Sequence, residues 1–179
     1  AALQELLQVA EKWGGRVDAM INNAGYSQWK SIGDIEEVFW NRMIDTNLKG
    51  TFFGCKAAAK VLPNGGCIIN ISSLAGKRGS ANNSAYCASK FGVNGITQAL
   101  AKELGGRNIR VNAVCPVYVR TEGLIEALEA DEAPPGGEEV EVYLRNFAKS
   151  NSALGTLPTG AEIGRVCVFL ASSEASAVT

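Results

Sequence analysis

The sequence predicts an α/β fold of the Rossmann-like type, in which a doubly wound parallel sheet carries helices on both faces. Three short apolar runs, at residues 17–22, 67–71 and 109–114, have the length and continuity of buried strands. Two segments with apolar residues spaced by three and four lie between them, at residues 35–62 and 86–104. This alternation of strand and helix is typical of a parallel sheet.

The boundaries of these elements follow from turn-forming residues. Residues 1–15 have the pattern of an amphipathic helix that ends at two glycines, which favours a helix over a signal peptide. The helix at 35–62 is expected to stop at Pro63-Asn64-Gly65-Gly66, and the helix at 86–104 at Gly105-Gly106. Each strand leads into a polar or glycine-containing stretch, and the carboxyl ends of parallel strands share one edge of the sheet. Three candidate functional loops therefore meet there: NNAG, NISS and VCPVYVRT.

Composition narrows the class of protein. The chain has 179 residues, of which 46% are hydrophobic, and a net charge of −1. We expect residues 1–179 to form a single domain, and nothing in the charge favours nucleic acid or an anionic membrane as a partner. No apolar stretch approaches the roughly 20 residues that a membrane helix needs.

The cysteines and the absence of histidine point to a reducing compartment and no metal site. The five cysteines are odd in number, far apart and set in apolar runs, which favours buried free thiols and a cytoplasmic location over disulfides. Without histidine, zinc and haem sites lose their commonest ligand.

Residues 122–153 differ in character from the rest. Residues 122–141 hold eight acidic residues, no lysine or arginine, and the sequence Pro134-Pro135-Gly136-Gly137. One interpretation is a solvated, mobile excursion. The other is a flap over the active site that carries substrate contacts, because the segment directly follows one of the three loops.

The stretch SAYCASK places Tyr86 and Lys90 one helical turn apart, on the same face. A free tyrosine titrates near pH 10, too high for a base at neutral pH. A unit charge about 4 Å away, at an effective dielectric constant of about 20, supplies roughly 4 kcal/mol, or about 3 pKa units. Lys90 could thus bring the phenol near working pH. The alternative is a purely structural pair, in which the tyrosine belongs to the core and the lysine to the surface.

Together, these residues resemble the short-chain dehydrogenase/reductase family over essentially the whole chain, most weakly at 122–152. Tyr-x-x-x-Lys alone is a weak signal, but NNAG upstream and a serine 13 residues before the tyrosine make it strong. The matching segments are DAMINNAG at 18–25, Asn47, ISS at 71–73, Tyr86-x-x-x-Lys90 and VNAVCP at 111–116.

The resemblance implies a catalytic role for four residues. Tyr86 would exchange the proton at the substrate oxygen, and Lys90 would lower its pKa and bind the nicotinamide ribose. Ser73 would hydrogen-bond the same substrate oxygen. Asn47 would anchor a chain of water molecules leading from Lys90 to solvent. Ser72, one residue off the family spacing, is expected to be structural.

The resemblance also implies NAD or NADP as cofactor. Backbone near the adenosine side would come from Asn23, Ala24 and Gly25. The nicotinamide carboxamide would be held by the loop containing Pro116, Val117, Val119 and Thr121. The family usually has glycine where this chain has Val117, and a β-branched residue disfavours positive φ, so the loop is expected to follow a different path.

The family's glycine-rich phosphate loop, T-G-x-x-x-G-x-G, is absent from this sequence, as are the residues that select NAD or NADP. We expect a fragment of a protein of about 250 residues, lacking the first βαβαβ part and the last strand of the fold. The alternative is a degenerate protein that no longer binds dinucleotide.

The function implied is an oxidoreductase that moves hydride between NAD(P) and a carbonyl/alcohol substrate. A free small molecule such as a sugar, polyol or hydroxy-ketone is favoured over 3-oxoacyl groups on acidic acyl carrier protein. Arg107 alone matches a basic docking patch, and the acidic run at 122–141 opposes an acidic partner. The alternative is a non-catalytic binding or regulatory protein.

The resemblance further implies a homodimer or homotetramer. Its contacts would be the two long helices at 35–62 and 86–104. Phe52, Phe53 and Phe91 on these helices could equally belong to the core.

Overall fold

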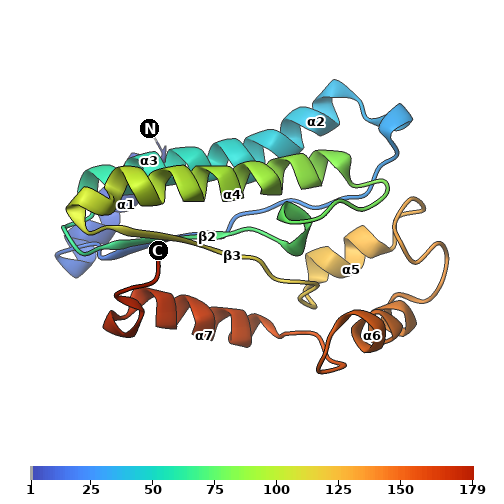
Figure 1. The fold of residues 1–179 in the computed structure, drawn as a ribbon. Helices are drawn as coiled ribbons and strands as arrows, with labels where there is room; N and C mark the ends of the chain where they lie inside the picture. The colour runs from blue at the N-terminus through green and yellow to red at the C-terminus, as the bar shows by residue number, and fades with distance from the viewer. Residues whose placement is uncertain (1) are drawn as a thin grey trace.

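The computed structural model describes residues 2–179 and confirms the predicted α/β architecture (Figure 1). Within that range three parallel strands form one sheet in the order β1–β2–β3. Ala19 is paired with Cys67, and Ile71 with Val114. The strands are β1 (Ala19–Asn22), β2 (Cys67–Ile71) and β3 (Arg110–Val114). Each begins within two residues of its predicted start and ends where the sequence predicts.

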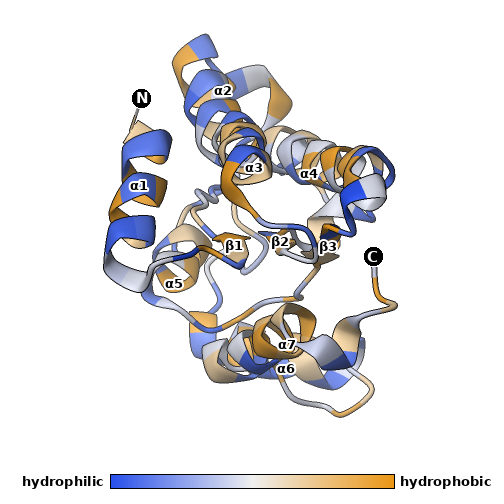
Figure 2. Cartoon of the chain, turned by 90° about the vertical axis from the view of Figure 1, so that its left-hand side faces the viewer, coloured by the Kyte–Doolittle hydropathy of each residue, from blue (hydrophilic) through white to orange (hydrophobic). Residues whose placement is uncertain are grey.

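The helices lie on both faces of the sheet. Figure 2 shows the strands between α3 and α4 above and α7 below, which confirms the double winding. The helix α1 ends where Gly15 adopts a positive φ of 76°, a conformation that glycine favours. The bounds are α1 (Ala2–Gly14), α2 (Glu37–Ile44), α3 (Gly50–Val61), α4 (Ser84–Leu104), α5 (Glu122–Leu128), α6 (Val140–Asn151) and α7 (Gly160–Ala171).

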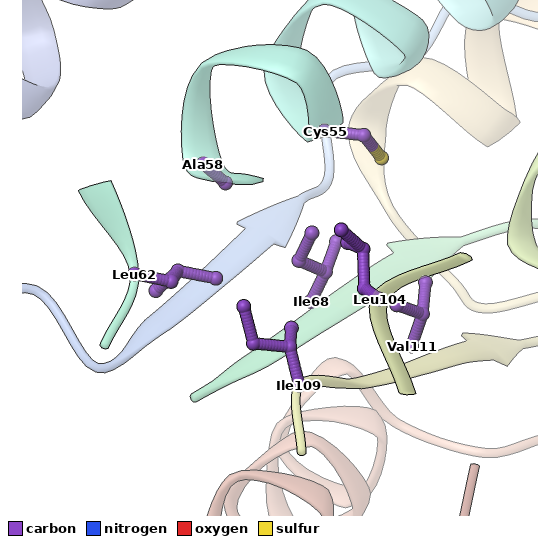
Figure 3. Close-up of a cluster of buried hydrophobic side chains, with 7 residues drawn as sticks. All are labelled: Cys55, Ala58, Leu62, Ile68, Leu104, Ile109 and Val111. Carbon is purple, nitrogen blue, oxygen red and sulfur yellow. The ribbon is translucent and has the colours of Figure 1, made fainter. Parts of the chain in front are cut away.

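Strand β2 is buried on both faces, as its continuous apolar sequence predicts. Ile68 belongs to a cluster between the sheet and helices α3 and α4, while Cys67 and Ile69 pack against α7. The first cluster contains Cys55, Ala58, Leu62, Ile68, Leu104, Ile109 and Val111 (Figure 3). Its members come from α3, α4 and two strands, with Leu62 directly after α3 and Ile109 directly before β3. This layer packs the helices onto the sheet.

The predicted helix at 35–62 is not uniform. A π-helical segment, Asp45–Lys49, joins α2 to α3, and the N–H of Gly50 donates to the carbonyl of Asp45. A π-helix inserts an extra residue into the turn and often occurs at functional sites. It contains Asn47, which is fully buried. Apolar spacing alone gave no sign of this change in pitch.

The acidic segment is structured in two helices, α5 and α6. Their apolar side chains form a cluster with Trp29 from the loop after β1. Glu132 accepts a hydrogen bond from the N–H of Ser31, and its carbonyl accepts one from Asn82 at 3.1 Å. These contacts place the segment against the loops at the carboxyl edge of the sheet. Its role as a flap over the active site stays a prediction.

The five cysteines are all free thiols. Four are buried and Cys115 is partly exposed. No helix within residues 2–179 has both the length and the apolar character that a membrane span requires.

Candidate active site

A cavity of about 680 Å³ lies at the carboxyl edge of the sheet. The loops that follow the three strands line it, together with residues of α5 and α6. Of the predicted site residues, only Ala24 and Asn47 do not face it. The others do: Asn23, Gly25, Ser73, Tyr86, Lys90, Pro116, Val117, Val119 and Thr121.

The loop after β2 is clamped onto α4, and this clamp positions Ser73. The side chain of Ser72 donates to the carbonyl of Lys90 at 3.2 Å, and Asn94 donates to the carbonyl of Gly76 at 2.8 Å. A methyl group on Gly76 would lie 2.7 Å from both Asn94 Nδ2 and the Lys90 carbonyl oxygen. Only glycine allows this close approach. The contact made by Ser72 fits the structural role predicted for it.

Tyr86 and Lys90 face the same cavity from the first two turns of α4. The Lys90 ammonium lies 5.7 Å from the centre of the Tyr86 ring. Its Nζ donates to the carbonyl of Ile71, the last residue of β2, at 2.9 Å. Lys90 is 4% exposed, so this carbonyl and the ring are its immediate surroundings.

Burial dominates the titration of both groups. It raises the pKa of Tyr86, and a side-chain hydrogen bond with Ser73 opposes the rise. Burial lowers the pKa of Lys90 from 10.5 to about 8. The prediction that Lys90 brings the tyrosine pKa down toward neutrality is therefore wrong for the protein chain by itself. Desolvation is the largest cause of the shift, so near neutral pH the phenol holds its proton.

Asn47 holds the loop after β1. Its Oδ1 accepts from the N–H of Tyr26 at 2.7 Å, and its Nδ2 donates to the carbonyl of Tyr26 at 2.8 Å and to Ser89 at 3.1 Å. A Cβ placed on Gly25 would come 3.6 Å from Asn47 Oδ1 and 3.8 Å from Lys90 Nζ. The amide thus orients the backbone next to Lys90. Its predicted role in a water chain stays a prediction.

The loop after β3 forms the other wall. The carbonyl of Pro116 accepts from the N–H of Leu74 at 2.8 Å, which ties this loop to the one carrying Ser73. Thr121 caps α5, since its Oγ1 accepts from the N–H of Leu124 at 3.2 Å. Its hydroxyl proton is still available for donation. Within residues 2–179, Asn82 and Asn108 are the non-glycine residues with positive φ. Val117 therefore does not adopt the positive φ that a glycine at this position could adopt.

Sequence reasoning missed several residues of the lining. Arg42, Arg78, Trp29 and Tyr118 all face the cavity. Trp29 and Tyr118 pack edge to face with ring centres 6.3 Å apart. The ring centres of Tyr118 and Phe147 are 4.5 Å apart. These residues come from loops and helices distant in sequence. The one signal available was that Arg78 lies between Ser73 and Tyr86.

The structure fits the nicotinamide end of a dinucleotide. Lys90 and Thr121 both line the cavity, so the ammonium can meet ribose hydroxyls and the Thr121 hydroxyl can donate to a carboxamide. A parallel α/β sheet with serine, tyrosine and lysine in one cavity at its carboxyl edge is the arrangement that the resemblance to short-chain dehydrogenases/reductases implies.

Comparisons with known proteins identify the family. A family model described as Enoyl-(Acyl carrier protein) reductase matches residues 1–179. The chain is 36% identical to 3-oxoacyl-acyl-carrier-protein reductase FabG of Thermotoga maritima, over 99% of this chain and 68% of the relative. It is also 36% identical to 2-(S)-hydroxypropyl-CoM dehydrogenase 3 of Xanthobacter autotrophicus, over 95% of this chain and 65% of the relative.

A solved structure agrees. The short-chain dehydrogenase/reductase SDR:Glucose/ribitol dehydrogenase of Brucella melitensis superimposes with a TM-score of 0.86 at 30% identity, covering 99% of this chain and 67% of that one. The chain belongs to the short-chain dehydrogenase/reductase family, whose members are oxidoreductases that use NAD or NADP. It spans about two-thirds of the length of these relatives.

Proposed function

We propose that this protein catalyses reversible hydride transfer between NAD or NADP and a carbonyl/alcohol carbon, with Tyr86 as the general acid/base. The observation that carries this proposal is the convergence of Ser73, Tyr86 and Lys90 on one cavity. The bound nicotinamide would supply or accept the hydride.

The protein residues would act on the substrate oxygen. Tyr86 holds its proton near neutral pH, because burial raises its pKa, and can donate it to an oxygen that gains negative charge. Ser73 would hydrogen-bond the same oxygen, since Ser73 and Tyr86 line the same cavity. The Lys90 ammonium, below its pKa of about 8, would stabilise the phenolate that remains. The aromatic wall of Trp29 and Tyr118 would restrict water.

The substrate is proposed to be a free small molecule. Docking of acidic acyl carrier protein depends on exposed basic groups. Arg107, the one predicted candidate, donates to the carbonyls of Ala59 at 2.5 Å and Leu62 at 2.6 Å, at the end of α3. These bonds give Arg107 a structural role. The 3-oxoacyl carrier-protein substrate remains the alternative, supported by the name of the Thermotoga relative.

The decisive experiment compares turnover with cofactor binding. The absorbance of reduced nicotinamide is followed with NADH or NADPH across a panel of ketones, for the wild type and for Tyr86→Phe. We expect turnover in the wild type, and at least a hundredfold loss in the variant with little change in cofactor affinity. Turnover retained by Tyr86→Phe would refute the proton-transfer role. Cofactor binding without turnover in either protein would support the non-catalytic alternative.

We also propose that α3 and α4 form the contact between copies of the chain. Phe52 and Phe53 are each 45% exposed and Phe91 is 49% exposed, so these side chains are not part of the core. Sedimentation should show a dimer or tetramer that Phe91→Glu dissociates. A monomeric wild type would contradict this.

A further inference from the structure

Positive charge prevails in the lining of the cavity. Among residues 2–179, Arg42, Arg78 and Lys90 line it, against Glu126 as the one carboxylate. The chain as a whole has a net charge of −1. Residues 122–141, which include part of the lining of the cavity, hold eight acidic residues. Glu126 alone of these eight lines the cavity, so the acidic run leaves the balance of charge inside the cavity positive.

Arg78 is an exposed residue that lines the cavity. It lies on the loop between Ser73 and Tyr86, and its backbone N–H donates to the carbonyl of Leu74 at 3.1 Å. Its charge lowers the pKa of the Tyr118 hydroxyl, against a larger rise caused by burial. Arg78 and Tyr118 line the same cavity.

This guanidinium has no carboxylate partner in the part of the chain that the structure describes. The ion pairs there use Arg16, Lys49, Arg120 and Arg165. Arg42 stacks on the Tyr26 ring, with its guanidinium carbon 4.0 Å from the ring centre. A guanidinium stays protonated at any working pH, and its fork of N–H groups matches the two oxygens of a carboxylate.

We propose that the substrate is a small oxo acid or hydroxy acid, and that Arg78 recognises the carboxylate at the end remote from the reacting carbon. The inference rests on the proposed function and narrows its substrate class. The apolar middle of such a compound would lie along Tyr118, Phe147 and Trp29, which line the cavity beside the polar groups. A phosphate would satisfy the same guanidinium, so both oxyanions enter the test.

The kinetic test uses matched substrates and a matched control. Short keto acids are compared with their methyl esters and with keto phosphates, for the wild type, Arg78→Met, Arg78→Lys and Lys77→Met. Lys77 is the exposed neighbour of Arg78 and does not line the cavity. We expect Arg78→Met to raise the KM for keto acids about tenfold or more, with kcat and the esters little changed. Arg78→Lys should retain part of the preference, and Lys77→Met all of it.

Salt provides a readout that a purely structural role would not change. Added sodium chloride should raise the KM for keto acids and not that for esters, and Arg78→Met should abolish this difference. A preference for phosphates over carboxylates, an equal use of acids and esters by the wild type, or a changed KM for NAD(P)H in place of the keto acid would each overturn the proposal.

A binding experiment separates this inference from the proposed function. Hexanoate and hexanamide are titrated into the protein while tryptophan fluorescence is followed, since Trp29 lines the cavity. Binding of hexanoate that Arg78→Met abolishes supports the inference, even where no ketone is turned over and the oxidoreductase proposal fails. Equal binding of acid and amide refutes it, even where ketone turnover upholds the oxidoreductase.

Discussion

Replacing Lys90 with methionine should stabilise the fold at neutral pH, and the gain should shrink at alkaline pH. Lys90 is 4% exposed, and burial lowers the pKa of its amine from 10.5 to about 8. At pH about 7 the folded protein therefore carries a buried charge at a cost of about 3 kcal/mol. Methionine removes that cost and fills a similar volume. It also forfeits the bond to the Ile71 carbonyl, worth about 1 kcal/mol, so the net gain is about 2 kcal/mol.

The pH dependence of the stability difference between the wild type and Lys90→Met is a more specific prediction than its value at one pH. Above pH about 8 the folded wild type holds Lys90 neutral, while the unfolded chain keeps the amine protonated up to about pH 10.5. The unfolded state then binds more protons, so wild-type stability rises relative to the variant. At pH about 9.5 the cost of burial is about 1.4 kcal/mol, and the stability gap therefore closes by about 2 kcal/mol between the two pH values.

Urea unfolding followed by circular dichroism measures this gap. Lys102→Met, at an exposed position of the same helix, is the control and should show no pH-dependent difference. A Lys90→Met variant that is less stable than wild type at pH about 7, or a gap that does not change with pH, would refute the reasoning about burial.

Three further predictions follow from other contacts. Gly76→Ala places a methyl group 2.7 Å from a backbone oxygen of α4; it should cost about 1–3 kcal/mol in urea unfolding and lower kcat by displacing Ser73, and unchanged values would contradict the clamp. Thr159→Ala removes the capping box of α7 and should cost about 1 kcal/mol in the same assay, whereas Thr159→Ser should restore it. Alkylation by iodoacetamide at pH about 8 should label Cys115 first, because burial raises the pKa of Cys55 to about 11; early labelling of Cys55 in peptide mass spectra would be inconsistent with this packing.

The parts of the fold that depend on local pattern were predictable. Strand β2 was predicted at its observed bounds because burial on both faces requires an unbroken apolar run, and α4 ended at the expected glycines. The π-helix around Asn47 was not, because an extra residue in one turn leaves the apolar spacing of the flanking helices unchanged.

Some features of the candidate site were likewise predictable from the sequence, and others were not. The residues of motifs at strand ends were found, since topology brings those ends together. The burial of Trp29 depends on Leu128 and Leu144, about a hundred residues away in the chain, and no local pattern encodes it. The direction of the Tyr86 pKa also required the fold, because burial of the side chain is the largest cause of the rise and the local sequence does not reveal that burial.

The most direct test of the account is the fate of the hydride. The purified protein is incubated with a keto acid and NADH or NADPH carrying deuterium at both C4 positions of the nicotinamide, and the alcohol is analysed by mass spectrometry. We expect one deuterium at the carbinol carbon in the wild type and no alcohol from Tyr86→Phe. An alcohol without deuterium, or equal product from the variant, would contradict the proposal that this cavity carries out hydride transfer with Tyr86 as its proton donor.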